Sequence, residues 1–150
     1  MSRNSQRILR VRRLLEDLAH LELEKKTVEM RRLETAAAGQ RSLALAARTD
    51  AMQILEGRKD SATPDWLMGI ADAEILAWKG GRLAALARAR RPDIEAARAE
   101  LLGRRLDRRQ LESLAAEAAQ AELQTEVRRE QKQADDWFQS RVARAGRGQK

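Results

Sequence analysis

The sequence contains no cysteine and no tyrosine, and only one phenylalanine, three tryptophans and two prolines among its 150 residues. Without cysteine the chain can form neither a disulfide framework nor a thiolate metal site. So few aromatic residues give little material for a globular core. No apolar run approaches the roughly 20 residues needed to span a bilayer, and the first residues are polar. We therefore expect an elongated cytoplasmic protein.

The residues that are abundant favour long helices. Charged residues make up 35% of the chain, and the most frequent residue types are alanine, arginine, leucine and glutamate. This composition is typical of long helices that bury one narrow apolar seam.

A coiled-coil pattern runs through the first third of the chain. Residues 5–56 contain no proline and a single glycine, Gly39. Apolar residues recur at alternating spacings of three and four, which predicts a seam. The pattern weakens at Glu22 and Lys25 and then resumes in another phase, as in a stutter. The seam is expected at Ile8, Val11, Leu15 and Leu18, and after the change of phase at Met30, Leu33 and Ala37.

We expect the whole chain, 1–150, to form a single coiled-coil domain. Glycine and proline residues mark the ends of the helices that follow the first one. After the first helix, at about 5–56, a glycine and a polar loop lead to Thr63 as an N-cap and Pro64 at the first helical position. Gly80-Gly81 and then Arg91-Pro92 are expected to interrupt the helix that follows. The predicted parts are a loop with one or two short helices at about 57–92, a long helix at about 93–145, and a flexible tail at 146–150.

Helix lengths predict the architecture. At about 1.5 Å per residue, residues 5–56 would form a helix of roughly 78 Å and residues 93–145 one of about 80 Å. Two helices of equal length joined at one end favour an elongated antiparallel two-helix coiled-coil hairpin, with one or two short helices at its tip. Both termini are then expected at the opposite end, and the isolated chain is expected to be a monomer.

The positive charge is concentrated near the two termini. Residues 1–15 hold five arginines and no acidic residue, and residues 126–150 hold seven basic and four acidic residues, so the two stretches carry +5 and +3. The other 110 residues carry −1, within a total of +7. Such a surplus suits attraction to an acidic partner, although basic tails are also common without a function.

No motif in the sequence points to catalysis. His20 is the only histidine and has no second metal ligand four residues away. Gly80-Gly81 lacks the Lys-Ser/Thr of a phosphate-binding loop. Carboxylates on thin helices lie in no cleft that would shift their pKa values. We expect no enzyme activity, no cofactor and no metal site.

A charged block lies in the C-terminal helix. Val127, Ala134, Phe138 and Val142 share one helix face, which we expect to pack on Ile8, Val11 and Leu15. The polar residues beside this face exceed what pairing requires and predict a docking surface. They are Arg128, Arg129, Lys132, Gln133 and Asp135.

This block carries a family resemblance. Residues 126–138, Glu-Val-Arg-Arg-Glu-Gln-Lys-Gln-Ala-Asp-Asp-Trp-Phe, resemble the C-terminal signature of the flagellar export protein FliJ. Gln131, Lys132 and Asp135 fall on signature positions, and Asp136 stands where the family commonly has glutamate. The match covers about 20 residues, and the rest of the chain agrees in length and organisation. Virulence-secretion stalk proteins of the YscO type share this build.

The resemblance implies a function. FliJ-type proteins are similar in shape to the central stalk of rotary ATP synthases: their helix ends enter the hexameric export ATPase, promote its assembly and stimulate hydrolysis. They also contact the cytoplasmic domain of the export-gate membrane protein, which places them in the cytoplasm at the inner membrane, and some recycle export chaperones. The ATPase-docking residues implied here are Arg7, Arg10, Arg13, Arg128, Gln131, Lys132 and Asp135. The gate-binding residues implied are Trp66, Ile70 and Leu76, although Trp66 is equally suited to packing.

Two other functions fit the composition. A basic coiled coil with a pI near 10.7 can bind nucleic acid, but the interleaved acidic residues and scarce aromatics argue against it, so no nucleic-acid partner is expected. A purely structural, oligomeric coiled coil is the other alternative.

Overall fold

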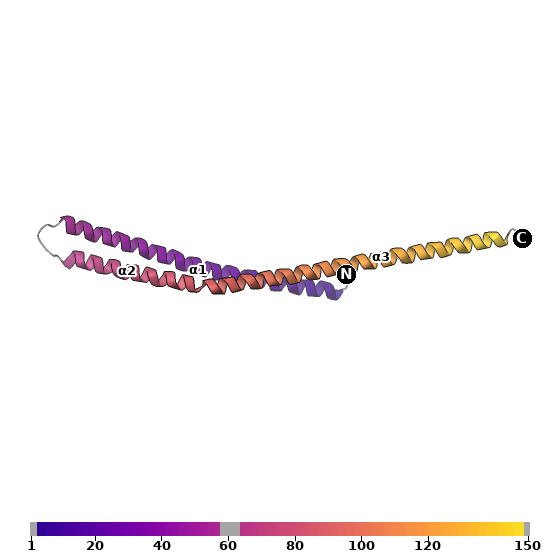
Figure 1. The fold of residues 1–150 in the computed structure, drawn as a ribbon, viewed down its shortest axis with the longest axis horizontal. Coiled ribbons are helices and arrows are strands. Elements are labelled where there is room, and N and C mark those ends of the chain that lie inside the picture. The colour runs from indigo at the N-terminus through magenta and orange to yellow at the C-terminus, as the bar shows by residue number, and fades with distance from the viewer. Residues whose placement is uncertain (1–2, 58–63, 149–150) are drawn as a thin grey trace. The chain divides into compact units, whose positions relative to one another are not determined.

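The computed structural model describes residues 3–57 and 64–148, which are helical almost throughout. Figure 1 shows the three helices in chain order: α1 (Arg3–Gly57), α2 (Pro64–Ala89) and α3 (Arg91–Arg147). No strand is present in these described stretches. The all-α fold expected from the sequence is confirmed.

The helix ends lie close to the positions indicated by glycine and proline. α1 ends at Gly57 and α2 begins at Pro64, as expected, whereas Thr63 lies outside the described residues. The interruption near Arg91-Pro92 is a turn at Arg90, whose carbonyl oxygen accepts a hydrogen bond from the Ile94 N–H at 3.1 Å. α3 continues through Arg147, so the expected tail is helical as far as that residue, and 149–150 lie outside the described residues.

The expected interruption at Gly80-Gly81 is wrong, because α2 runs through both glycines. Glycine inside a helix costs about 1 kcal/mol relative to alanine. At Gly80 this cost is offset by close packing: a Cβ there would lie 3.3 Å from the Ala37 carbonyl oxygen of α1. The residue that looks like a helix breaker therefore lies at a helix contact.

The three helices form two compact units. Unit 1 comprises Met1–Glu16 and Gly103–Lys150, and unit 2 comprises Asp17–Leu102. The single domain expected over 1–150 stays a prediction.

Unit 2 contains an unbroken heptad seam on α1. Its less exposed residues recur at spacings of three and four with no change of phase, so the stutter expected at Glu22 and Lys25 is wrong. Lys26 lies on the seam since its aliphatic stem can pack while its Nζ reaches Glu22 Oε1 at 3.9 Å. The seam residues are Ala19, Leu23, Lys26, Met30, Leu33, Ala37, Gln40, Ala44, Ala47 and Ala51.

Small residues bring α1 and α2 unusually close together in unit 2. Buried small residues recur every seven positions on each helix, so the two backbones can approach. At Gly69 an added Cβ would lie 2.9 Å from the Cβ of Ala51. The residues of this small-residue seam are Ala37, Ala44 and Ala51 on α1 and Ala73, Gly80 and Ala87 on α2.

In unit 1 the seam of α1 lies one residue away from the expected one. Leu9 is 7% exposed, whereas Ile8 and Val11 are 48% and 54% exposed, and Leu15 is half-buried. In unit 2 the expected Leu18 is also exposed. The face that contacts α3 in unit 1 includes Arg12 and Glu16, which form ion pairs, so a search for apolar residues misses it.

Candidate functional site

The C-terminal part of α3 is the most exposed stretch of unit 1. Every residue from 120 to 147 is exposed although the whole stretch is helical. We call residues 120–147 the exposed segment. The expected packing of this segment on Ile8, Val11 and Leu15 is wrong: Val127 is 51% exposed, Phe138 is 64% exposed, and Ala134 and Val142 are exposed as well.

The exposed segment begins where the seam of α3 loses its apolar residues. Leu111, Ala115 and Ala119 are half-buried and follow one another at spacings of four. If the seam is continued beyond Ala119 at alternating spacings of three and four, every further seam position carries a charged or polar residue. Such residues cannot form an apolar coiled-coil contact. These positions are Glu122, Glu126, Arg129, Gln133, Asp136 and Ser140.

Apolar side chains of the exposed segment lie on a different face. Leu123, Val127 and Ala134 each follow a seam position by one residue, which is a rotation of about 100° around the helix. Phe138 lies on the same face, at a spacing of four from Ala134. The segment therefore presents an apolar strip that is separate from the seam holding α3 to α1. Its members are Leu123, Val127, Ala134, Phe138 and Val142.

The four α3 residues implied in ATPase docking all lie on the exposed segment. Arg128, Gln131, Lys132 and Asp135 are exposed and make no ion pair or hydrogen bond through their side chains among the described residues. No polar contact within the described chain therefore explains why these four positions carry charged or amide side chains. Their side chains are available to a partner.

The arginines of α1 lie apart from these four residues. Arg7 and Arg10 are exposed, and no polar contact between described residues joins them to the exposed segment. Arg13 donates a hydrogen bond from Nη2 to Glu112 Oε1 at 3.4 Å, and Arg12 Nη1 reaches Asp107 Oδ2 at 3.3 Å. Carboxylates of α3 thus compensate part of the positive charge near the N-terminus. The sequence had predicted that this charge and the positive charge near the C-terminus act together at one end of the hairpin.

The basic end of the exposed segment is less compensated. Residues 137–147 carry Arg141, Arg144 and Arg147 and no acidic residue. The Arg141 guanidinium lies over the Trp137 ring, 5.1 Å from its centroid, which is a cation–π contact. The ring remains 60% exposed.

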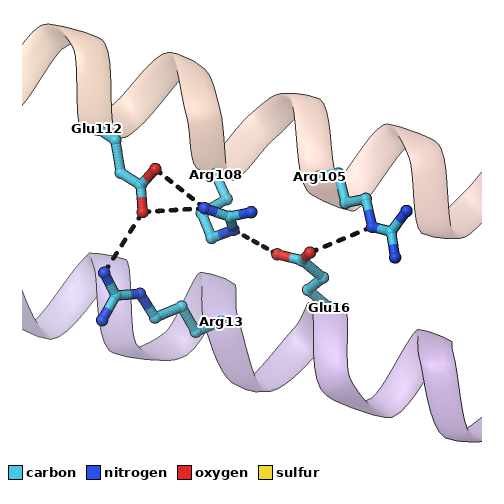
Figure 2. A network of polar contacts seen from close by, with 5 residues as sticks. All are labelled: Arg13, Glu16, Arg105, Arg108 and Glu112. Atoms are coloured by element: carbon cyan, nitrogen blue, oxygen red, sulfur yellow. Dashed lines mark hydrogen bonds and ion pairs between the residues drawn. The ribbon is translucent and has the colours of Figure 1, made fainter.

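A five-residue ionic network holds α1 to α3 next to the exposed segment (Figure 2). Glu16 of α1 accepts a hydrogen bond from Arg108 Nε and pairs with Arg105 Nε at 3.4 Å. Arg108 Nη1 also donates to Glu112 Oε2 at 2.9 Å, and Arg13 reaches the same carboxylate from α1. The network bridges the two helices where the face of α1 carries Arg12 and Glu16 in place of apolar residues.

The network stabilises its own charged forms. The hydrogen bond from Arg108 is the main reason why the pKa values of Glu16 and Glu112 lie below the ordinary range of a glutamate. The hydrogen bond to Glu16 in turn raises the pKa of Arg108. Glu16 has the least exposed side chain of the five, at 16%. Because the contacts are polar and partly exposed, we expect the pairing of α1 with α3 here to weaken at high salt.

The residues implied in gate binding lie in unit 2, on α2. Trp66, Ile70 and Leu76 are all half-buried. The Trp66 Nε1 atom is buried and has no hydrogen-bond partner among the described residues. Ile70 lines a groove of about 450 Å³ between α1 and α2, together with Ala44. These positions suit packing between the two helices at least as well as binding of a partner.

A more exposed aromatic residue was missed by the sequence analysis. Trp78 is 61% exposed, and the Arg82 guanidinium lies over its ring at 5.2 Å from the centroid. Ile75 and Leu86 on the same helix are 52% and 50% exposed. α2 is apolar on several faces, a pattern that indicates a further covering partner and could have been recognised from its composition.

Comparisons with protein-family models, with curated proteins and with solved structures found no match to this chain. Within the described helices no stretch is both long and apolar enough to cross a membrane. The described residues also contain no cluster of three or more histidine, aspartate or glutamate side chains placed to hold a metal ion.

Proposed function

We propose that this chain is a non-catalytic, stalk-like component of a flagellar type III export apparatus, which binds the hexameric export ATPase and promotes its assembly and activity. A stalk protein of a virulence secretion system is the variant of this proposal with the same mechanism. The observation that carries it is the exposed segment. It is a helix of seven to eight turns without a partner in unit 1, and it bears the residues that resemble the FliJ signature.

The proposal includes an antiparallel hairpin. In unit 1 Arg13 pairs with Glu112 while Glu16 pairs with Arg105, so higher numbers on α1 meet lower numbers on α3. In unit 2 the Cβ positions of Gly80 and Gly69 approach Ala37 and Ala51, which is the same order for α1 and α2. Within each unit these contacts support antiparallel pairing of the helices.

Polar side chains suit the inner surface of a ring ATPase. A stalk must form and release contacts as each subunit changes state, and exposed charge-assisted hydrogen bonds contribute only about 1 kcal/mol or less each. Arg128, Lys132 and Asp135 can make such contacts without weakening the fold, because their side chains are exposed and form no ion pair or hydrogen bond among the described residues. Deep apolar burial at these positions would slow release.

The remaining parts of the proposal concern the export gate and the cell. Trp66, Ile70 and Leu76 are proposed to contact the cytoplasmic domain of the gate protein, which would place this chain in the cytoplasm at the inner membrane. The supporting observation is the apolar surface of α2, where Trp78 and Ile75 stay exposed. Export chaperones are further proposed partners.

The proposal is tested by two matched double variants assayed with the export ATPase of the same cell. Gln131→Ala with Lys132→Glu changes the signature, whereas Arg109→Glu with Gln110→Ala makes the same kind of change at exposed positions beside the paired part of α3. Both variants should keep wild-type helicity and melting temperature, since all four side chains are exposed. Only the signature variant should lose stimulation of ATP hydrolysis.

Stimulation at the wild-type level by both variants would contradict the docking assignment. Equal loss in both would show that net charge, rather than the signature, drives the effect. Unfolding of the signature variant would show that these residues hold the helices together, against the exposure described above.

A further inference from the structure

The apolar strip is exposed along its whole length, and its pattern is self-complementary. We propose that two copies of this chain associate through their exposed segments as an antiparallel helix pair, centred between Lys132 and Gln133. This goes beyond the proposed function, and it replaces the monomer expected for the isolated chain.

The apolar residues match when one copy is reversed against the other. With the centre between Lys132 and Gln133, Leu123 of one copy faces Val142 of the second copy, and Val127 faces Phe138. Gln131, which lies on the same face between Val127 and Ala134, faces the small Ala134 of the other copy, a side chain that leaves the amide room and access to water. A twofold axis repeats each pair, as an isologous dimer requires.

Charge also favours this orientation. With the centre between Lys132 and Gln133, residues 137–147 of one copy face residues 118–128 of the other. Residues 137–147 hold three arginines and no acid, for +3, and residues 118–128 hold two glutamates and one arginine, for −1. Antiparallel pairing therefore places the basic end of each segment beside an acidic stretch of the other. A parallel pair would place like halves together, at a cost.

Individual residues beside the strip repeat this complementarity. In the antiparallel arrangement Glu126 lies within about two residues of the position opposite Arg141, and Arg128 within about two residues of the position opposite Asp135, on the two flanks of the strip. Such flanking pairs select orientation in coiled coils more than they add affinity. The sequence therefore specifies one orientation for the pair.

The contact is small, so the dimer should be weak. From Leu123 to Val142 the strip spans less than three heptads, and stable coiled coils usually need three to four. The buried area falls at the low end of specific interfaces, which is typical of transient association. We expect mainly monomer at about 1 µM and a substantial dimer fraction at about 100 µM.

The dimer would occupy the same segment that is proposed to dock on the ATPase. Self-association would then compete with ATPase binding and mask the apolar strip while no ATPase is bound. Because the dimer depends on apolar residues and the docking on polar ones, the two can be separated by mutation.

Sedimentation velocity of the full chain from about 1 to 100 µM tests the association. Val127→Glu with Phe138→Glu should reduce the dimer fraction at 100 µM by at least about tenfold, since both changes place charge in the strip. Leu106→Glu with Leu114→Glu is the matched control, because these leucines are 58% and 62% exposed on the paired part of α3. A wild-type chain that stays monomeric, or an equal loss of dimer in the control, would overturn the inference.

Spin labels test the orientation independently of those variants. Since the chain lacks cysteine, single labels can be placed at Gln124→Cys and at Gln133→Cys. Antiparallel pairing predicts that two labels at position 124 are separated by about 26 Å along the axis and two labels at position 133 by about 2 Å. Similar short distances at both positions would indicate a parallel pair and overturn the proposal. Stimulation of the export ATPase by the wild-type chain is measured separately. Its result decides the proposed function, whether or not the chain forms an antiparallel dimer.

Discussion

The close packing of α2 on α1 makes a sharp prediction about two glycines of one helix. An added Cβ at Gly69 would lie 2.9 Å from the Cβ of Ala51, whereas one at Gly81 would have no heavy atom within 4 Å. Alanine is favoured over glycine inside a helix by about 1 kcal/mol. Gly81→Ala should therefore stabilise the protein by about 0.5–1 kcal/mol, which corresponds to a rise of about 1–4 °C in melting temperature.

Gly69→Ala gains the same helix propensity but overfills the contact. Overpacking of a tight site costs about 1–3 kcal/mol, so the net change should lie between about zero and 2 kcal/mol of destabilisation. Thermal melts followed by circular dichroism, with wild type and Gly81→Ala as references, give the comparison.

A double-mutant cycle isolates the contact itself. Ala51→Gly combined with Gly69→Ala returns one methyl group to the interface, so the pair should be more stable than the sum of the single changes by about 1–2 kcal/mol. If Gly69→Ala stabilised the protein as much as Gly81→Ala does, α1 and α2 would not approach as closely as described.

Three further predictions concern the network, the exposed segment and α2. Because Arg108 lowers the pKa values of Glu16 and Glu112, their contribution to stability is present above the ordinary carboxyl range and is lost as pH falls below about 4. Glu16→Gln should therefore lower the melting temperature at pH 7 and have a smaller effect at pH 3. In hydrogen exchange, amides of residues 120–147 should exchange more than about tenfold faster than those of residues 94–111, since an isolated helix frays; equal rates would show that the segment is already covered. Trp66→Ala with Ile70→Ala should weaken binding to the gate domain and leave ATPase stimulation intact, and a loss of both with a lower melting temperature would assign the two residues to packing.

The fold class and most helix ends could be predicted from the sequence because glycine and proline act locally. Pro64 begins α2, where its fixed φ suits the first helical position, and Gly57 is the last residue of α1, although its φ is not positive. Gly80 could not be interpreted in this way, since its role depends on the α1 residues that it contacts. Helix propensity gives the free-energy cost of a glycine inside a helix, but it does not give the packing against another helix that offsets this cost.

The seam of unit 1 was missed because apolarity was the only criterion. Ile8 and Val11 fit a heptad pattern as well as Leu9 does, but the face that contacts α3 carries Arg12 and Glu16. An ion-paired face cannot be distinguished from a solvated one without knowing the residues opposite it.

The exposed segment was missed for a related reason. Equal helix lengths predicted that the whole C-terminal helix pairs with the first helix, whereas α2 packs along residues 37–51 of α1 in unit 2. The candidate docking residues themselves came from their resemblance to a signature, and the described contacts place no competing demand on Arg128, Gln131, Lys132 or Asp135.

Site-specific cross-linking tests the central claim most directly. A benzophenone maleimide attached at Gln131→Cys, in a chain that has no other cysteine, samples the signature, and the same group at Gln110→Cys is the matched control. Irradiation with the assembled export ATPase should give a covalent adduct from position 131 in an amount that falls with rising salt, and little or none from position 110. Equal adducts from both positions, or adducts from position 110 only, would contradict the docking of the exposed segment.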